Sequence, residues 1–362
     1  MGVTGNSAID PYSTQNRLDP LFYPIGTALT PGAATTTNYA NKDLSWEKTT
    51  AYNYGVDFSF FNTRISGSLD YFTAKTTDLL LLKTLPTVTG YANTYSNVGE
   101  TKSNGLELTL NTVNIEAGKF RWGTTINASM QANKIEKLTN GASDDIQNNW
   151  FIGEQLGVIY GYKSNGLWKE SDAAEMALFN ANGHNFSPGT ARPVDLNGDY
   201  KIDANNDRTI VGNTLPKYVV GMTNSFKYGD FELSVFLYGR LDYTYNTGGE
   251  AETGRFNQRQ INYYTEVNQN AEYQKPVYTA GTGDPYATTL GYKNGSFIRI
   301  RNISLGYNFP KQITERLGIN GLRLYVQVIN PGYLYSPIDF RDMDTDSSTY
   351  NRGFVSGLNF EF

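Results

Sequence analysis

The sequence predicts an all-β protein and, within that class, a transmembrane antiparallel β-barrel. Three observations lead to this prediction. The 362 residues include 27 Tyr, 19 Phe and 36 Gly, which suit pleated surfaces and the turns between strands. Long segments alternate apolar and polar residues with a period of two. Tight turns alternate with long connections between these segments, an asymmetry typical of membrane barrels.

Residues 1–43 carry small and polar side chains and no clear strand pattern. We expect an irregular segment there, or a loop of an upstream part of the barrel. The first residues contain neither the basic region nor the apolar stretch of a secretory signal peptide. We therefore expect Met1 not to be the true start of the gene product, and residues 44–362 to hold the barrel strands.

Alternation predicts the strands in order along the chain. Residues 52–60 and 65–71 form the first pair, with a tight turn at Asn62-Thr63. Further strands are expected at 106–110, 120–132, 218–226, 231–237, 303–309, 322–328 and 354–362. The longer runs reach about ten residues, the length that a tilted strand needs to cross a bilayer, whereas strands average about five or six residues in soluble folds. On this pattern alone, a soluble β-sandwich is the alternative.

The last predicted strand ends the chain on an aromatic residue. Leu358, Phe360 and Phe362 lie on one face of this strand, and Asn359 and Glu361 lie on the other. A terminal aromatic suits a barrel that closes its last strand against its first, with Phe362 at the membrane interface.

Composition argues against several classes of function. The net charge of −5 is small and the basic residues are scattered, so we expect no nucleic-acid partner. Cysteine is absent, and the single histidine, His184, lies in a stretch typical of a solvated loop. The carboxylate groups Asp144-Asp145 and Asp342/Asp344/Asp346 have no apolar sequence around them that would separate their pKa values, so we expect solvated loop charges. The sequence predicts that the protein is not an enzyme.

Five segments resemble one family when they are taken together and in order. They are "LSWEKTTAYNYGVDFSFFNTRISGSLDYF", "NVGETKSNGLELTLN", "FIGEQLGVIYGYKSNGLWK", "DLNGDYKIDANNDRTIVGNTLPKYVVGMTNSFKYGDFELSVFLYG" and "GSFIRIRNISLGYNFPK". They are similar to TonB-dependent outer-membrane transporters of the SusC/RagA type. The stretch "VQVINPGYLYSPIDFRDMD" departs from the family pattern, so the last extracellular loop is expected to be altered.

The resemblance implies a location in the bacterial outer membrane and the import of oligosaccharides, or of peptides, driven through TonB. It also implies a SusD-like surface lipoprotein as partner and recognition of the terminal strand, with Phe360 and Phe362, by the barrel-assembly machinery. Transporters of this type form plugged barrels of about 22 strands. The chain is therefore expected to be roughly the C-terminal half of such a barrel, with long extracellular loops, while the plug and the TonB-contacting part lie upstream. The alternative is a self-contained small barrel that acts as a pore or as a structural or adhesive protein; an outer-membrane enzyme is less compatible with the single histidine.

The segment "DLNGDYKIDANND" has the spacing of a calcium loop. Five candidate ligands occupy alternate positions, as in EF-hand loops: Asp195, Asn197, Asp199, the carbonyl of Lys201 and Asp203. Asp207, one place after the usual closing position, is the candidate bidentate closer. Tyr200 stands where such loops need glycine, so the alternative is a turn held by Asx hydrogen bonds. No cofactor is required by the sequence, and structural calcium is the one candidate.

Aromatic residues in the long connections are candidates for contact with substrate or partner. Tyrosine and tryptophan offer flat apolar platforms with a polar edge. The candidates are Trp150, Tyr160, Tyr162, Trp168, Tyr263 and Tyr264. The alternative is that the long loops use these rings to pack against one another.

Overall fold

The computed structural model describes residues 2–3, 14–15, 18–35, 38–97, 99–138, 143–247, 261–276, 285–346 and 350–362. Its main element is a ten-stranded sheet with the order β1-β5-β6-β9-β10-β15-β16-β19-β20-β21. The strands are β1 (Gly2–Val3), β5 (Lys48–Phe60), β6 (Ile65–Thr77), β9 (Glu100–Ala117), β10 (Phe120–Lys137), β15 (Tyr218–Tyr228), β16 (Phe231–Leu241), β19 (Phe297–Asn308), β20 (Gly321–Tyr335) and β21 (Gly353–Glu361). The pairings from β10 to β21 are antiparallel between neighbours in this order, as predicted.

The chain divides into two compact units. One comprises Met1–Gly55, Asp70–Leu106 and Gln131–Leu156, and the other comprises Val56–Leu69, Glu107–Met130 and Gly157–Phe362. The first unit contains, beside strand segments of the large sheet, a three-stranded sheet of β4 (Asn38–Tyr39), β8 (Asn93–Asn97) and β7 (Leu80–Thr84). It also contains the short 3-10 helices η1 (Thr87–Thr89) and η2 (Ile146–Asn148).

The first unit also differs from the sequence expectation for residues 1–43. Within this range, β2 (Leu18–Ile25) and β3 (Ala28–Thr35) form an antiparallel hairpin where an irregular segment was predicted. Gly26 makes the turn with φ +66°. Proline interrupts the alternation at positions 20, 24 and 31, and a two-stranded ribbon tolerates it because each strand is an edge strand. Whether this range belongs to an upstream part of a barrel stays a prediction.

In the second unit, tight turns join the strands at one end, which we call the hairpin end. The β5–β6 turn places Phe61, Asn62 and Thr63 in the left-handed region, with φ of 54°, 53° and 67°. Gly118 and Gly229 make the β9–β10 and β15–β16 turns, with φ of 59° and 58°. At the same end, β19 and β20 are joined by a hairpin that contains α2 (Lys311–Arg316).

The apolar face of these strands is exposed. Tyr228, Leu305, Val326, Phe354 and Phe360 are between 45% and 79% exposed. The largest buried side chains lie outside the sheet or at its loop end, among them Trp168, Tyr273, Phe297 and Ile338. An exposed apolar face of this extent marks an interaction surface, here one that lipid covers in a membrane barrel.

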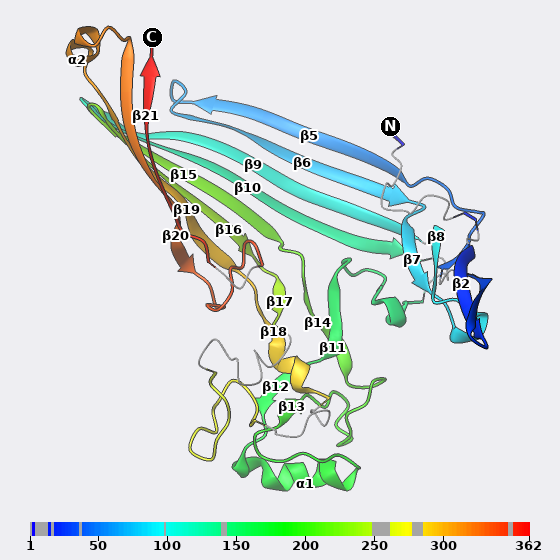
Figure 1. The fold of residues 1–362 in the computed structure, drawn as a ribbon. Helices are drawn as coiled ribbons and strands as arrows, with labels where there is room; N and C mark the ends of the chain where they lie inside the picture. The colour runs from blue at the N-terminus through cyan, green and yellow to red at the C-terminus, as the bar shows by residue number, and fades with distance from the viewer. Residues whose placement is uncertain are drawn as a thin grey trace. The chain divides into compact units, whose positions relative to one another are not determined.

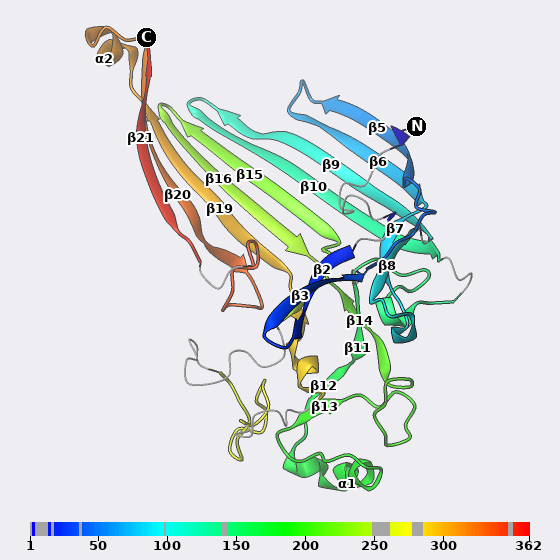
Figure 2. The ribbon, with the colours of Figure 1, turned by 45° about the vertical axis from the view of Figure 1, so that its right-hand side comes forward.

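The long connections of the second unit build a compact structure that we call the loop module (residues 157–213, 261–276 and 285–295). Figures 1 and 2 show it beyond the strands of this unit, with α1 at its far side. Its elements are β11 (Val158–Tyr162), β12 (Ser164–Leu167), η3 (Glu170–Asp172), α1 (Ala173–Ala181), β13 (Ala191–Pro193), β14 (Arg208–Asn213), η4 (Ala287–Gly291) and β18 (Tyr292–Asn294), which pairs with β17 (Thr244–Asn246). Trp168, Met176, Phe179, Phe186 and Ile202 form its main core.

None of the helices in the described parts of the chain is both long and apolar enough to span a membrane.

Candidate functional site

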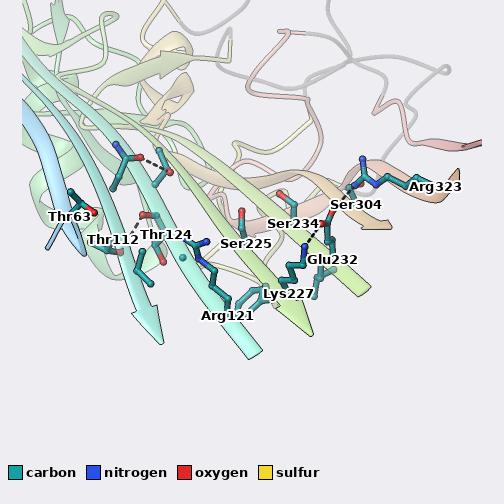
Figure 3. A pocket seen from close by; sticks show the side chains of 16 residues that line it. Thr63, Thr112, Arg121, Thr124, Ser225, Lys227, Glu232, Ser234, Ser304 and Arg323 are labelled. Carbon is teal, nitrogen blue, oxygen red and sulfur yellow. Dashed lines mark hydrogen bonds and ion pairs between the residues drawn. The ribbon is translucent and has the colours of Figure 1, made fainter. Parts of the chain in front are cut away.

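Charged side chains form a row across the polar face at the hairpin end of β10, β15 and β16 (Figure 3). The register places Arg121 opposite Lys227, and Lys227 opposite Glu232. Lys227 Nζ lies 3.3 Å from Glu232 Oε1, and Arg323 Nη2 lies 3.3 Å from Glu232 Oε2. The row therefore holds three cations and one carboxylate, two of the cations paired with that carboxylate, and its net charge is positive.

Arg323 reaches this row because the neighbouring strand offers no side chain in its path. Gly306 lies opposite Glu232 in the β16–β19 register. A Cβ atom on Gly306 would lie 2.8 Å from Arg323 Nη2, which is closer than real Cβ contacts allow. Glycine at this position lets the guanidinium of Arg323 cross the strand and approach Glu232.

A row of small residues lies next to the charged row, two residues further along each strand on the same face. Gly123, Ser225, Ser234 and Ser304 lie opposite one another across four strands. Together with the charged row they line a groove of about 460 Å³. Hydroxyl groups and cations can bind polar or anionic partners by hydrogen bonds.

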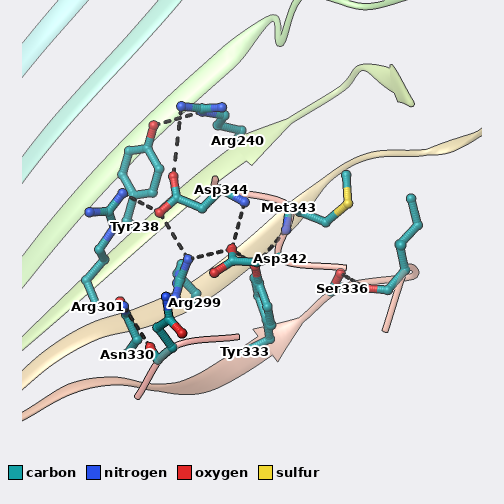
Figure 4. A network of polar contacts seen from close by, with 12 residues as sticks. Tyr238, Arg240, Arg299, Arg301, Asn330, Tyr333, Ser336, Asp342, Met343 and Asp344 are labelled. Atoms are coloured by element: carbon teal, nitrogen blue, oxygen red, sulfur yellow. Dashed lines mark hydrogen bonds and ion pairs between the residues drawn. The ribbon is translucent and has the colours of Figure 1, made fainter. Parts of the chain in front are cut away.

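A second polar cluster lies at the other end of β16, β19 and β20, where the strands meet the loop 336–346 (Figure 4). Arg299 Nη1 lies 2.9 Å from Asp342 Oδ1 and 3.0 Å from Asp344 Oδ2. Arg301 also pairs with Asp344, and Arg240 Nη2 lies 3.9 Å from Asp344 Oδ1. The side chains of Arg299, Asp342 and Asp344 are 1%, 4% and 2% exposed.

The expectation that these carboxylates are solvated is therefore wrong for Asp342 and Asp344, whereas Asp346 is 67% exposed. Arginines from the strand ends supply the compensating charge that a buried carboxylate requires. Burial opposes ionisation of Asp342, but hydrogen bonds from the Tyr333 hydroxyl and the Asp344 backbone, with the charge of Arg299, hold the pKa of Asp342 below its usual range.

Aromatic rings complete the surroundings of Arg299. The guanidinium carbon lies 5.1 Å from the ring centre of Tyr333 and 5.2 Å from that of Tyr350. Such cation–π contacts strengthen when water is excluded. Sequence reasoning missed this cluster, although arginines at alternate positions 299 and 301 and aspartates at 342 and 344 were a visible signal of charge pairing.

The predicted calcium segment forms a loop of Asx turns. Asp195 accepts the backbone N–H groups of Gly198 and Tyr200 at 2.7 and 2.8 Å. Asp203 accepts those of Asn205 and Asn206 at 2.8 and 2.9 Å, and these bonds hold its pKa below the usual range. This hydrogen-bonding pattern is the one expected for the alternative to a calcium site, a turn held by Asx hydrogen bonds.

Two features bear on whether calcium fits this loop. Tyr200 adopts φ +59°, the left-handed conformation that calcium loops assign to glycine. Asp207, the expected bidentate closer, is fully buried and accepts the Leu196 and Asp203 N–H groups through its two oxygens, at 2.9 and 2.8 Å. Among the described residues, no three His, Cys, Asp or Glu side chains converge as a metal site. The roles of Asn197, Asp199 and Lys201 as ligands, with calcium itself, stay a prediction.

His184 differs from the expectation of a solvated loop residue. Its Nε2 accepts the backbone N–H of Ile202 at 2.9 Å. The imidazole also stacks on Phe186, with ring centres 5.1 Å apart. His184 therefore holds the 195–207 loop against the core of the loop module, a structural role.

The aromatic residues predicted to contact substrate or partner differ in how far they are buried. Trp168 is 1% exposed and lies in the main core of the loop module, with Tyr162 packed against that core. Tyr264 is 5% exposed and belongs to a second core with Leu167, Ala191 and Leu290. These rings pack the loops and present no open platform. Tyr263 is 45% exposed, and Trp150 and Tyr160 are half-buried, so their contact with substrate or partner stays a prediction.

The terminal aromatics lie on the exposed apolar face as predicted. Phe360 and Phe362 are 54% and 89% exposed, and their rings stack with centres 6.4 Å apart. β21 pairs with β20 from Gly353 to Glu361, which fixes Phe360 opposite Leu322. Recognition by assembly machinery stays a prediction.

Long antiparallel strands in sequential order, with one exposed apolar face and one polar face, define an outer-membrane β-barrel protein. The family model described as TonB dependent receptor-like, beta-barrel, matches residues 10–331. The chain belongs to this family, whose members are outer-membrane transporters and not enzymes.

Individual relatives agree with this assignment. TonB-dependent receptor P3 of Formosa agariphila is 30% identical over 402 aligned positions, which cover 100% of this chain and 38% of the relative. TonB-dependent receptor SusC of Bacteroides thetaiotaomicron is 30% identical over 345 positions, with 89% and 32% covered. The RagAB peptide transporter shares the fold, with a TM-score of 0.77 at 21% identity, over 99% of this chain and 40% of that one. The chain thus spans between about a third and two fifths of the length of these relatives.

Proposed function

We propose that this chain is the C-terminal barrel portion of a TonB-dependent transporter that imports oligosaccharides or peptides too large for porins. The observation that carries the proposal is the division of the second unit's strands into an exposed apolar face and a polar face. The apolar face suits lipid, and the charged row with the serine row behind it suits a water-filled or protein-filled interior.

The partners follow from the same assignment. A SusD-like lipoprotein would contact the long loops, and TonB would act through a part of the protein outside this chain. Substrates of both classes are rich in hydrogen-bonding groups, which the hydroxyls and cations of the polar face can bind. RagAB, which shares the fold, is a peptide transporter. Oligosaccharides, which the sequence resemblance implies, are the second class to test.

The experiment is growth and uptake with the full-length gene deleted and restored. Restored cells should take up a defined set of oligosaccharides or peptides, and deleted cells should not. Ser234→Trp places a large ring in the groove of the polar face and is expected to reduce uptake strongly. Val235→Trp, one residue away on the opposite face of β16 and outside the lining of the groove, is the matched control and should leave uptake intact. Equal uptake by deleted and restored cells would contradict import.

A self-contained pore is the alternative function. It predicts passive, size-limited flux of small solutes that does not depend on the proton-motive force. Uptake that persists when TonB is deleted would favour the pore.

A further inference from the structure

The β19–β20 connection contains a short helix at the hairpin end, where the β9–β10 and β15–β16 connections are tight turns. α2 follows Pro310, and the chain reverses at Gly318, with φ +71°. Thr314 is its one buried residue, at 1% exposure. The Ile319 N–H donates to Thr314 O at 3.1 Å and closes the hairpin over this side of the helix.

Two large apolar side chains, one in α2 and one at its C-cap, are exposed. Ile313 is 42% exposed and Leu317 is 60% exposed. Residues four apart lie on the same side of a helix, so the two side chains form one apolar edge. By the same spacing, Arg316 flanks this edge, and Glu315 projects to the opposite side. The pair adds to the exposed apolar surface at the hairpin end, which includes Phe360 and Phe362.

The hairpin that carries the apolar edge lies next to the exposed apolar face of the sheet. Phe309, directly before the hairpin, packs on Tyr307 with ring centres 5.0 Å apart. The Asn320 N–H donates to Glu361 O at 2.7 Å, which ties the hairpin to the terminal strand between Phe360 and Phe362. In both ribbon views α2 lies beside the C-terminus (Figures 1 and 2). The helix therefore adjoins the exposed terminal aromatics.

We propose that α2 is an interfacial anchor that lies on the membrane leaflet at the hairpin end. Ile313 and Leu317 insert at the boundary between headgroups and acyl chains, where amphipathic helices bind. Arg316 extends its charge to the lipid phosphates while its aliphatic stem stays on the apolar side. Lys311 and Arg316 outweigh Glu315 in charge, which suits a phospholipid surface. The occupant is thus lipid, and the inference rests on the outer-membrane location and not on import.

The test uses the full-length protein in vesicles of phosphatidylethanolamine and phosphatidylglycerol. This chain has no cysteine, so Leu317→Cys introduces a single labelling site in it; any cysteine elsewhere in the protein is replaced by serine. An environment-sensitive fluorophore is attached to the introduced cysteine. Its emission is measured with and without lipids that carry a nitroxide quencher near the headgroup. Glu315→Cys is the matched control on the opposite side of the same helix. Heat-modifiable migration verifies that each variant is folded, and Ile313→Cys replaces Leu317→Cys if the latter fails to fold.

The expected result is blue-shifted emission and strong lipid quenching at position 317, with neither at position 315. Equal exposure of both positions to an aqueous quencher would overturn the proposal, because the helix would then lie in water. Shielding of position 317 from both lipid and water would also overturn it, since another protein segment would be the occupant.

Discussion

Arg299 on β19 and Asp342 in the loop that follows β20 form an ion pair of 2.9 Å, with side chains 1% and 4% exposed. Two such charges are costly to bury apart and tolerable only together. Asp344 extends the pair to Arg301 and Arg240, so two neighbouring strands hold the same loop. The loop 336–346 is therefore fixed to the strand ends by charge as well as by its packing of Ile338 and Met343 on Phe297.

Removing the arginine should release this loop. Arg299→Leu leaves Asp342 buried without its charge partner, and breaking such a pair typically costs about 3–5 kcal/mol. Hydrogen exchange of residues 336–346 in the folded protein should accelerate accordingly. Arg341→Leu is the control, because its partner Asp346 is 67% exposed and such pairs contribute about 1 kcal/mol or less. Similar exchange in both variants would show that the buried pair does not hold the loop.

The same loop should open in acid. The pKa of Asp342 is lowered in the folded protein by Tyr333, the Asp344 backbone and Arg299, against the effect of burial. A carboxyl with a lowered folded pKa stabilises at pH above its unfolded value, near 3.9, and this contribution is lost as the pH falls through the folded value. Exchange of residues 336–346 should therefore rise below about pH 4. Asp342→Asn should flatten this dependence; an unchanged profile would assign the acid opening to other groups.

The strands of the sheet were predictable because lipid and the polar interior impose a period of two that needs no tertiary information. The alternating segments predicted at 52–60 and 120–132 fall within β5 and β10. Phe360 and Phe362 are exposed, as the alternation of the last strand indicates. The hairpin at 18–35 was missed because proline breaks the alternation without breaking an isolated ribbon.

The loop contacts were not predictable from local sequence. Arg299 and Asp342 lie 43 residues apart, and only the fold brings them together. Trp168 lies in a long connection and was a candidate for an exposed contact residue. In the structure, Met176 and Phe179 of α1 pack against it and bury it. Burial of this kind depends on partners distant in sequence, which alternation and spacing do not reveal.

Trp168 should support the fold of the loop module and not a binding surface. Trp168→Ala removes the ring that contacts Phe179 and Phe186, and a buried tryptophan replaced by alanine typically costs about 3–5 kcal/mol. Limited proteolysis should then cut within 157–213 while the barrel still shows heat-modifiable migration. Tyr263→Ala, at a 45% exposed position, is the control and should leave the cleavage pattern unchanged. Resistance of the Trp168→Ala protein would contradict the core role.

Hydrogen exchange also tests whether calcium binds the 195–207 loop. A bound ion that contacts Asp195, Asp199 and Asp203 should slow hydrogen exchange of the loop at roughly millimolar calcium, the range of extracellular modules. Magnesium is the control ion, because it demands shorter and more regular coordination. Asp199→Ala should abolish the calcium effect. Identical exchange with and without calcium would leave the Asx turns as the full account of this segment.

The terminal aromatic should matter for assembly more than for packing. Phe362 is 89% exposed and contacts Phe360 by stacking, so little of the folded structure depends on it. Phe362→Asp places a charge on the apolar face of the last strand, where the membrane interface and the assembly machinery are expected to recognise an aromatic. The variant should reach the outer membrane in lower yield, measured as the heat-modifiable fraction in isolated membranes. Asn359→Asp adds the same charge on the polar face opposite Arg323 and should assemble normally. Equal yields from the two variants would show that the terminal ring carries no assembly signal.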